Sequence, residues 1–415
     1  MQQFTKPSGV TMHAIVLLLC LLSAATTFAQ KGSSSNSPNI TITNGEGGRI
    51  YHWEVSEMPS SLGQMKGPFR LEETIVPGKD NFEIVQDSSS GSEPNGSKSR
   101  GSKITLPAAE GKDTAIRVLR SIYPAKSYAR SKDKHPSFVA MPLPNAAFSG
   151  PKARYIRIEY QLKFQPGFQW VKGGKLPGAL IGSEKGCNAA CSGGGSAENC
   201  FSTRLMWRKD GQGELYLYAA KSVYFPKEAP ETCKRSLDKR SPEALFLLEQ
   251  RQMDAVAMPE YNDDDELSDD NEPHVLAKRA ETSSCLKGMR IKTSPGARSV
   301  CNPKFGISIG RGGAFKFQAG NWHNVTQVLK VNSKGKAVKD GYLAVYLDGN
   351  VVIEAQDLVL LKNGYDPQSK DATMNQVKFM FSSFFGGGSS DYATPVEQWI
   401  DWKGFSMTTS GKNMW

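Results

Sequence analysis

The residues best suited to chemistry lie in two short stretches separated by a turn. Residues 201–208 read Phe-Ser-Thr-Arg-Leu-Met-Trp-Arg and residues 214–218 read Glu-Leu-Tyr-Leu-Tyr, around the turn sequence Asp-Gly-Gln-Gly. Side chains along a strand alternate between its two faces. A hairpin built from these stretches therefore has one mainly apolar face and one face rich in hydroxyl, phenol and cationic groups. The apolar face would carry Thr203, Leu205, Trp207, Leu215 and Leu217, and the polar face Ser202, Arg204, Met206, Arg208, Glu214, Tyr216 and Tyr218.

The polar face suits the β-elimination of a uronic acid polymer. That reaction removes the C5 proton beside the carboxylate and expels the glycosidic oxygen at C4, so it needs a cation, a base and an acid. The fork of Arg204 suits a carboxylate. A nearby cation is expected to lower the pKa of a phenol, which would let Tyr216 or Tyr218 take and return a proton. The alternative is that these residues form an ordinary solvated sheet face.

The turn also gives an expected pairing of the two strands. If it is centred near Gly211, Arg204 lies opposite Tyr218, with Cβ atoms about 4.5 to 5.5 Å apart. A slip of one residue would bury charge and expose leucines, so the division into faces is well specified even where the partner is not. This pairing favours Tyr218 over Tyr216 as the reacting phenol.

Alternating runs elsewhere predict a chain of short strands. The clearest is 155–164, where Ile156, Ile158, Tyr160, Leu162 and Phe164 would share one face. An Asp-Gly-Asn turn at 348–350 accepts the positive φ of a tight hairpin. We predict an all-β fold, a β-jelly roll sandwich of antiparallel sheets with long loops. The other predicted strands are 114–122, 202–208, 214–219, 322–331, 341–347, 351–355, 376–381 and 398–407.

The N-terminus is typical of an exported protein. Residues 1–29 read as a signal peptide, with Lys6 and His13 before an apolar run and a small-residue exit at Ala29. The apolar run is well short of the roughly 20 residues that span a bilayer. We therefore expect a secreted protein with no membrane segment, a flexible segment at 30–50 and one domain at 51–415.

The cysteines fit an oxidising compartment. The chain has seven, and loss of Cys20 with the signal leaves six, enough for up to three disulfides. A zinc site is the rival interpretation, but the pair Cys187 and Cys191 has no second pair of ligands. Asn-x-Ser/Thr sequons at Asn39, Asn95 and Asn324 fit a glycoprotein.

Residues 234–284 interrupt the strand pattern. They contain an acidic run at 263–266, one possible helix at 242–253 and three dibasic pairs, which indicates a disordered, exposed insertion. A dibasic-cleaving processing protease is a possible partner, and an ordinary surface loop is the alternative. Cys233 and Cys285 could hold the halves together after a cut.

The charge balance favours a polyanionic partner. The formal charge is +10, and an exported protein meets acidic glycans more often than nucleic acid. No run of Lys and Arg interleaved with aromatic residues resembles a nucleic-acid groove. A plain effect on solubility is the alternative reading of the charge.

These motifs resemble those of polysaccharide lyase family 14, the alginate and polyglucuronate lyases. The resemblance implies a β-jelly roll that cleaves an acidic polysaccharide by β-elimination, with no cofactor and no catalytic metal. It rests on residues 174–178 (Gly-Lys-Leu-Pro-Gly), 191–194, 200–208, 213–218, 308–312 (Ser-Ile-Gly-Arg-Gly), 322–329 and 381–387, which follow one another through most of the chain.

The resemblance also implies the site residues. By motif they are Lys175, Ser202, Arg204, Tyr216 and Tyr218. Lys175 would reach in from a loop and, with Arg204, counter the substrate carboxylate, while Ser202 assists by hydrogen bonding and the tyrosines act as base and acid. Ala179 and the long insertion depart from the family pattern.

We expect the lyase to act as a monomer. Two other functions are alternatives to a lyase. A noncatalytic glycan-binding jelly roll would not need all five residues. A glycoside hydrolase would use two carboxylates, for which Glu159 and Glu214 are the visible candidates. His323 is more simply a hydrogen-bonded structural histidine than a site residue.

Overall fold

Strands make up almost all of the regular structure. The computed structural model describes residues 28–29, 39–45, 48–69, 79–87, 116–129, 137–140, 153–182, 191, 197–227, 284–303, 306–368, 377–387 and 389–414. The one α-helix in these ranges is the single turn α2 (Lys221–Tyr224). No helix in the described part of the chain is long and apolar enough to span a membrane. The 3₁₀ turns are η1 (Leu62–Lys66), η2 (Lys79–Asn81), η4 (Lys209–Gly211), η5 (Ser284–Leu286) and η6 (Ser390–Tyr392).

The larger of two sheets, called sheet A here, is built mainly from strands in the N-terminal and C-terminal thirds of the chain. Its strands are β1 (Phe28–Ala29), β2 (Asn39–Gly45), β3 (Gly48–Val55), β4 (Phe82–Gln86), β5 (Arg117–Tyr123), β7 (Tyr155–Phe164), β11 (Arg290–Thr293), β15 (Trp322–Lys330), β16 (Gly341–Leu347), β17 (Asn350–Leu358) and β20 (Gln398–Ser410). They follow the order β1-β2-β3-β20-β7-β15-β16-β17-β11, with β5 beside β20 and β4 beside β5.

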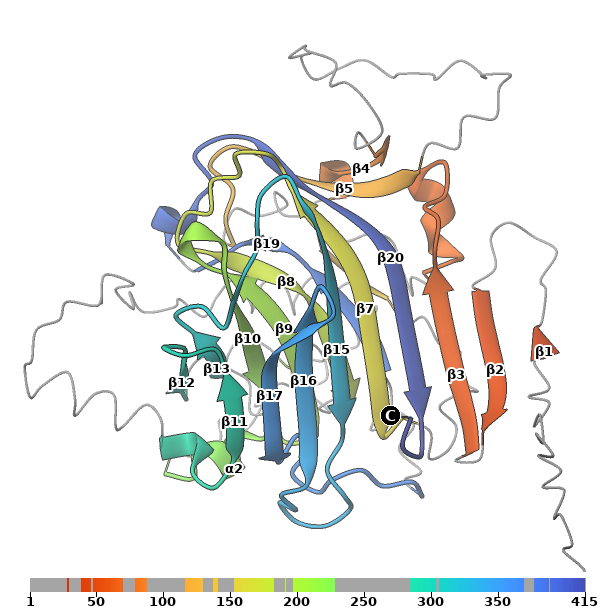
Figure 1. Cartoon of the computed structure of the whole chain (residues 1–415), viewed down its shortest axis with the longest axis vertical. Helices are drawn as coiled ribbons and strands as arrows, with labels where there is room; N and C mark the ends of the chain where they lie inside the picture. Colours follow the sequence, from red (N-terminus) through yellow and green to blue (C-terminus); the bar gives the residue numbers. More distant parts are fainter. Residues whose placement is uncertain are drawn as a thin grey trace, which may run out of the picture.

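The second sheet, sheet B, carries the predicted hairpin at its centre. Its strands are β6 (Ser137–Ala140), β8 (Gly174–Gly182), β9 (Cys200–Trp207), β10 (Gln212–Tyr218), β12 (Arg298–Asn302), β13 (Gly306–Arg311), β14 (Phe315–Lys316), β18 (Val377–Ser382) and β19 (Phe384–Phe385). The order is β12-β13-β10-β9-β8-β18-β6, with β14 beside β10 and β19 beside β8. Figure 1 shows β7, β15 and β20 of sheet A in front of β8 and β9 of sheet B.

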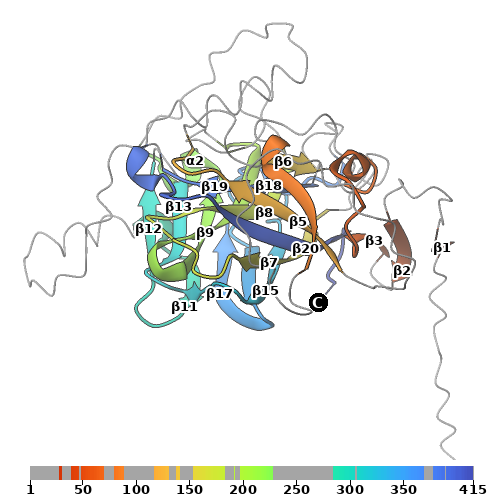
Figure 2. The ribbon, with the colours of Figure 1, turned by 90° about the horizontal axis from the view of Figure 1, so that it is seen from above.

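The core lies between the two sheets. In β7 the side chains of Ile156, Ile158, Tyr160, Leu162 and Phe164 are all fully buried, as their alternation predicts. They form one cluster with the inward-facing side chains of sheet B. Figure 2, seen from above, shows the two layers facing each other. All strand pairs are antiparallel, so the predicted all-β sandwich of the jelly-roll class is confirmed.

Some sequence-based expectations need correction. Residues 39–50, predicted to be flexible, contain β2 and the start of β3, because Tyr51 and Trp53 anchor β3 in the core. The hairpin turn between β16 and β17 uses Asp348 and Gly349 at positive φ, and Asn350 already belongs to β17. Residues 1–27 of the predicted signal peptide (1–29) and nearly all of the predicted insertion at 234–284 lie outside the described residues.

Two disulfides join cysteines of the described chain. Cys191 pairs with Cys200 at the start of β9, and Cys285 pairs with Cys301 in β12. The suggested bond between Cys233 and Cys285 is therefore wrong. Cys187 and Cys233 lie outside the described residues.

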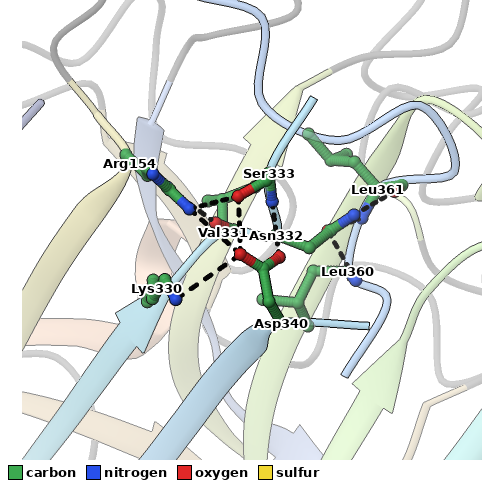
Figure 3. A network of polar contacts seen from close by, with 8 residues as sticks. All are labelled: Arg154, Lys330, Val331, Asn332, Ser333, Asp340, Leu360 and Leu361. Carbon is green, nitrogen blue, oxygen red and sulfur yellow. Dashed lines mark hydrogen bonds and ion pairs between the residues drawn. The ribbon is translucent and has the colours of Figure 1, made fainter. Parts of the chain in front are cut away.

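Side-chain hydrogen bonds fix the connection that follows β15. Asp340 accepts hydrogen bonds from the backbone and hydroxyl of Ser333 and from Arg154, while Lys330 lies 3.5 Å away (Figure 3). Asn332 accepts from the backbone N–H groups of Leu360 and Leu361. This network joins the ends of β15, β16 and β17 to the start of β7, and so holds one end of sheet A rigid.

Close approach of two backbones fixes the position of β8. The register between β8 and β9 shifts between Lys175 and Gly178, where β8 bulges. A Cβ atom at Gly178 would collide with the carbonyl oxygen of Thr203. Only glycine fits here, and this explains one residue of the Gly-Lys-Leu-Pro-Gly motif.

We expect Gly178→Ala to lower the free energy of unfolding by about 1–3 kcal/mol or more, because backbone atoms cannot move aside easily. Chemical denaturation followed by circular dichroism measures the change. Gly63→Ala is the matched control, since a Cβ there meets nothing within 4 Å. Equal stability of the two variants would contradict the close approach of β8 and β9.

Candidate active site

The pairing of β9 with β10 differs from the predicted one by two residues. Arg204 lies opposite Tyr216, and Ser202 lies opposite Tyr218. The turn is centred on Asp210 instead of Gly211, and both residues adopt positive φ, 58° and 78°. The predicted pairing of Arg204 with Tyr218 is therefore wrong. A shift of two keeps every side chain on its predicted face.

The two faces have the predicted composition, but both are buried. Leu205, Trp207, Leu215 and Leu217 pack into the core between the sheets. On the outer face of sheet B, Arg204 is 2%, Tyr216 4% and Tyr218 6% exposed. The alternative of an ordinary solvated sheet face is therefore wrong.

Lys175 joins this outer face from β8. It was expected in a loop, but it is a strand residue paired with Met206. Its Nζ lies 2.8 Å from the sulfur of Met206 and 3.4 Å from the ring centroid of Tyr216. Burial, followed by the charges of Arg204 and Arg208, holds its pKa well below the ordinary value. The sequence pattern did not predict this strand, because the proline of Lys-Leu-Pro-Gly is rare in the middle of a sheet.

Arg204 is a buried cation that lacks a carboxylate partner in the described part of the chain. Its Nε and Nη1 are buried and make no hydrogen bond to any described residue. Burial lowers its pKa, and the nearby Tyr218 and then Tyr216 offset this in part. An unpaired guanidinium in such surroundings is a strong site for an anion, because a carboxylate would satisfy both its charge and its hydrogen bonds.

The two tyrosines are adjacent on β10. Their hydroxyl oxygens lie 3.5 Å apart, and their rings meet edge to face with centroids 5.2 Å apart. The expectation that nearby cations lower the phenol pKa is wrong for Tyr216, because burial dominates and raises its pKa well above the ordinary value, while Arg208 and Arg204 oppose it. Tyr216 is therefore suited to hold and donate a proton.

Ser202 is held by the loop before β9. It is fully buried, and its hydroxyl donates to the carbonyl oxygen of Cys191 at 2.8 Å. Cys191 is itself fixed to Cys200 by a disulfide. Ser202 therefore ties the disulfide loop to the strand that carries Arg204.

Four residues of the same neighbourhood have no role in the lyase site predicted from the sequence. Arg208 binds Glu214 at 2.6 Å, and Glu214 is fully buried. Burial alone would raise the pKa of Glu214, but Arg208, Arg311 and Lys175 outweigh it and lower that pKa. Ser308 pairs with Tyr216 from β13. Strand parity already placed Arg208 and Glu214 here, whereas Ser308 and Arg311 required the order of strands.

The two other candidate groups lie elsewhere. His323, in β15 of sheet A, contacts Asp348 through Nδ1 at 2.8 Å and accepts from the backbone of Gln318 through Nε2, as expected of a structural histidine. Glu159 lies on the outer face of sheet A, bound to Arg157. The core separates it from Glu214, so these two carboxylates cannot flank one glycosidic bond. Among the residues described, no group of three or more His, Cys, Asp or Glu side chains could hold a metal ion.

Comparison with known proteins decides the family. The model of the polysaccharide lyase 14 family matches residues 111–258 and 280–405, most of the chain. The chain belongs to this family. It is therefore a polysaccharide lyase, and a noncatalytic glycan-binding role is no longer supported. Among curated proteins, none matches this sequence.

Several solved structures are similar to the lyase. The marine PL-14 alginate lyase from Aplysia kurodai is 22% identical, with 86% of this chain and 97% of that chain covered and a TM-score of 0.49. An alginate lyase from Chlorella virus is 18% identical, with 72% of this chain and 87% of that chain covered and a TM-score of 0.41. An endo-β-1,4-glucuronan lyase from Trichoderma reesei is 8% identical, with 80% of this chain and 89% of that chain covered and a TM-score of 0.35.

We expect Lys175→Met to stabilise the lyase at neutral pH by roughly 1 kcal/mol or more, because the buried amine lacks a carboxylate partner among the described residues. The pKa of Lys175 is lower in the folded chain than in the unfolded chain. Between these two pKa values the unfolded chain binds more protons, so stability rises with pH up to about 10.5. The gain from the substitution should shrink over the same range. Thermal unfolding at several pH values measures it.

Lys163→Met is the matched control for this prediction. Lys163 is also buried, but it binds Asp87 at 2.9 Å, so its loss should cost about 1–3 kcal/mol. Destabilisation by both substitutions would contradict the account of Lys175.

Proposed function

We propose that the lyase is secreted and cleaves a uronic-acid-containing polysaccharide, of the alginate or polyglucuronate type, by β-elimination. The observation that carries the proposal is Arg204, a buried guanidinium beside two phenols, with two nitrogens that make no hydrogen bond to a described residue. Neutral sugars would leave this charge unpaired, whereas a uronate carboxylate would satisfy it.

Arg204 and Lys175 would neutralise the carboxylate of the sugar that reacts. Abstraction of the C5 proton places negative charge on that carboxylate, and fixed cations stabilise the charge as it develops. The approach of a carboxylate also favours the protonated form of Lys175, which burial otherwise disfavours.

The tyrosines would handle the two protons. The C5–H and C4–O bonds break, a C4=C5 double bond forms, one proton goes to the base and another joins the leaving oxygen. Tyr216 suits the acid because burial holds its proton. Tyr218 suits the base because, of the two phenols, it has the larger electrostatic effect on Arg204. This assignment replaces the pairing that first suggested Tyr218, which was wrong.

The decisive test is the incubation of the purified lyase with alginate and polyglucuronate while ultraviolet absorbance is followed. An unsaturated product is expected from at least one of them. Arg204→Lys should lower kcat/KM by about 10²–10³-fold, because lysine lacks the fork. Tyr216→Phe and Tyr218→Phe should each lower kcat by about 10²–10⁴-fold.

Tyr342→Phe on β16 of sheet A is the matched control, and it should retain full activity. Absence of an unsaturated product on every uronan would sink the proposal. An equal loss of activity in the Tyr342→Phe variant would show that the effect of a tyrosine-to-phenylalanine substitution is not specific to the proposed site.

Export is part of the proposal and rests on the signal-like N-terminus together with two disulfides. N-terminal sequencing of protein recovered from the medium of a eukaryotic host should begin near Gln30. Such a cut would remove β1. Retention inside the cells with an intact Met1 would contradict it. The same sample shows whether a protease cuts the dibasic sites in 234–284.

A further inference from the structure

The outer face of sheet B contains another residue, Ser308, whose buried side chain has no partner among the described residues. Ser308 is 4% exposed, and its Oγ is buried and makes no hydrogen bond to the residues that the structure describes. A buried hydroxyl left unpaired costs about 1–3 kcal/mol, and an apolar residue would suit a central strand better. Ser308 therefore carries a cost that folding alone does not explain.

Strand order places Ser308 across the tyrosines from Arg204. Ser308 pairs with Tyr216, and Tyr216 pairs with Arg204, so the three form one row over β13, β10 and β9. Neighbouring strands lie about 4.8 Å apart, which separates the backbones of β13 and β9 by about 10 Å. The repeat of a 1,4-linked sugar chain is close to one strand spacing. Two consecutive sugars can therefore straddle β10.

A cation accompanies Ser308 on β13. Arg311 follows Gly310, whose positive φ of 84° interrupts the alternation of the strand. The charge of Arg311 lowers the pKa of both Glu214 and Lys175, so its field reaches the middle of the site. Strand β13 thus offers a hydroxyl and a guanidinium, as β9 does with Ser202 and Arg204.

The local charge balance favours an anion at this second position. Arg208 and Glu214 compensate each other at 2.6 Å, and Glu214 is the acidic residue among the largest influences on the pKa of Lys175. The amine of Lys175 and Nη2 of Arg208 contact the same sulfur, that of Met206, at 2.8 and 3.8 Å. Among the described residues named here, Lys175, Arg204, Arg208 and Arg311 therefore outnumber the one carboxylate, Glu214.

We propose that Ser308 and Arg311 form a second carboxylate subsite, which binds the uronate that leaves with the glycosidic oxygen. This rests on the proposed function. The sugar that loses its C5 proton lies between β9 and β10 with its carboxylate toward Arg204, the bond that breaks lies over the tyrosines of β10, and the neighbouring sugar lies between β10 and β13 with its carboxylate toward Ser308. The lyase then prefers stretches of consecutive uronates to polymers in which uronates alternate with neutral sugars.

Binding of a defined hexauronate tests the subsite. Titration calorimetry uses the Tyr218→Phe background, so that turnover does not consume the ligand. Arg311→Gln should weaken binding roughly 10-fold and Ser308→Ala about 3- to 10-fold, as expected for hydrogen bonds to a charged group. Arg49→Gln, the same change of charge on an exposed residue of β3, should leave affinity unchanged.

Two further measurements separate binding from structure and from catalysis. Ser308→Ala should not lower the melting temperature, because the hydroxyl makes no bond to a described residue. In the otherwise unaltered enzyme, Arg311→Gln should raise KM roughly 10-fold and leave kcat within about twofold. A polymer with alternating uronates should bind the parent protein only about as well as the hexauronate binds the Arg311 variant.

The outcomes distinguish this inference from the proposed function. If unsaturated product forms but affinity is indifferent to both Arg311 and Ser308, the subsite is wrong and elimination stands. If binding depends on both residues but no unsaturated product forms, the subsite stands and elimination is wrong. If no uronan binds, both are wrong.

Discussion

The alternation of side chains along β9 and β10 determines both the core and the site. Trp207 points inward and meets the rings of Phe164, Phe168 and Phe385 at 5.2 to 5.9 Å. Because these rings fill the space between the sheets, the two strands cannot slip by one residue without exposing leucines and burying charge. The position of Arg204 and of both tyrosines is therefore fixed by apolar packing on the opposite face of the same strands.

The two outer faces of the sandwich treat buried charge differently. On sheet A, Arg120 forms two hydrogen bonds with the buried Asp401, and Lys163 and Lys403 share Asp87. On sheet B, the described contacts of Lys175 and Arg204 include no carboxylate. Desolvated cations without counterions destabilise a fold. A protein bears such a cost where the missing counterion is the ligand, and this asymmetry supports the proposed site on sheet B.

The sequence predicted what depends on parity and missed what depends on turns and bulges. Alternation gave the sandwich, the faces of the hairpin and the buried side of β7. The partner of Arg204 depended on the turn, which is centred on Asp210, a non-glycine residue at positive φ, instead of on Gly211. Lys175 was missed as a strand residue because Pro177 and the bulge at Gly178 hide the alternation of β8. The pKa of Tyr216 depends on burial from several strands, which no local pattern records.

The arrangement of the cations is more informative than their number. A formal charge of +10 raises the rate at which any polyanion meets the protein, but at physiological ionic strength charges more than about 8 Å apart are largely screened in solvent. Remote basic residues therefore cannot distinguish a uronate from another anion. Lys175 and Arg204 are buried, so screening acts on them weakly, and the fork of Arg204 matches a planar carboxylate. In the proposed mechanism, recognition and chemistry therefore depend on the same few buried groups, and the basic surface contributes only to encounter.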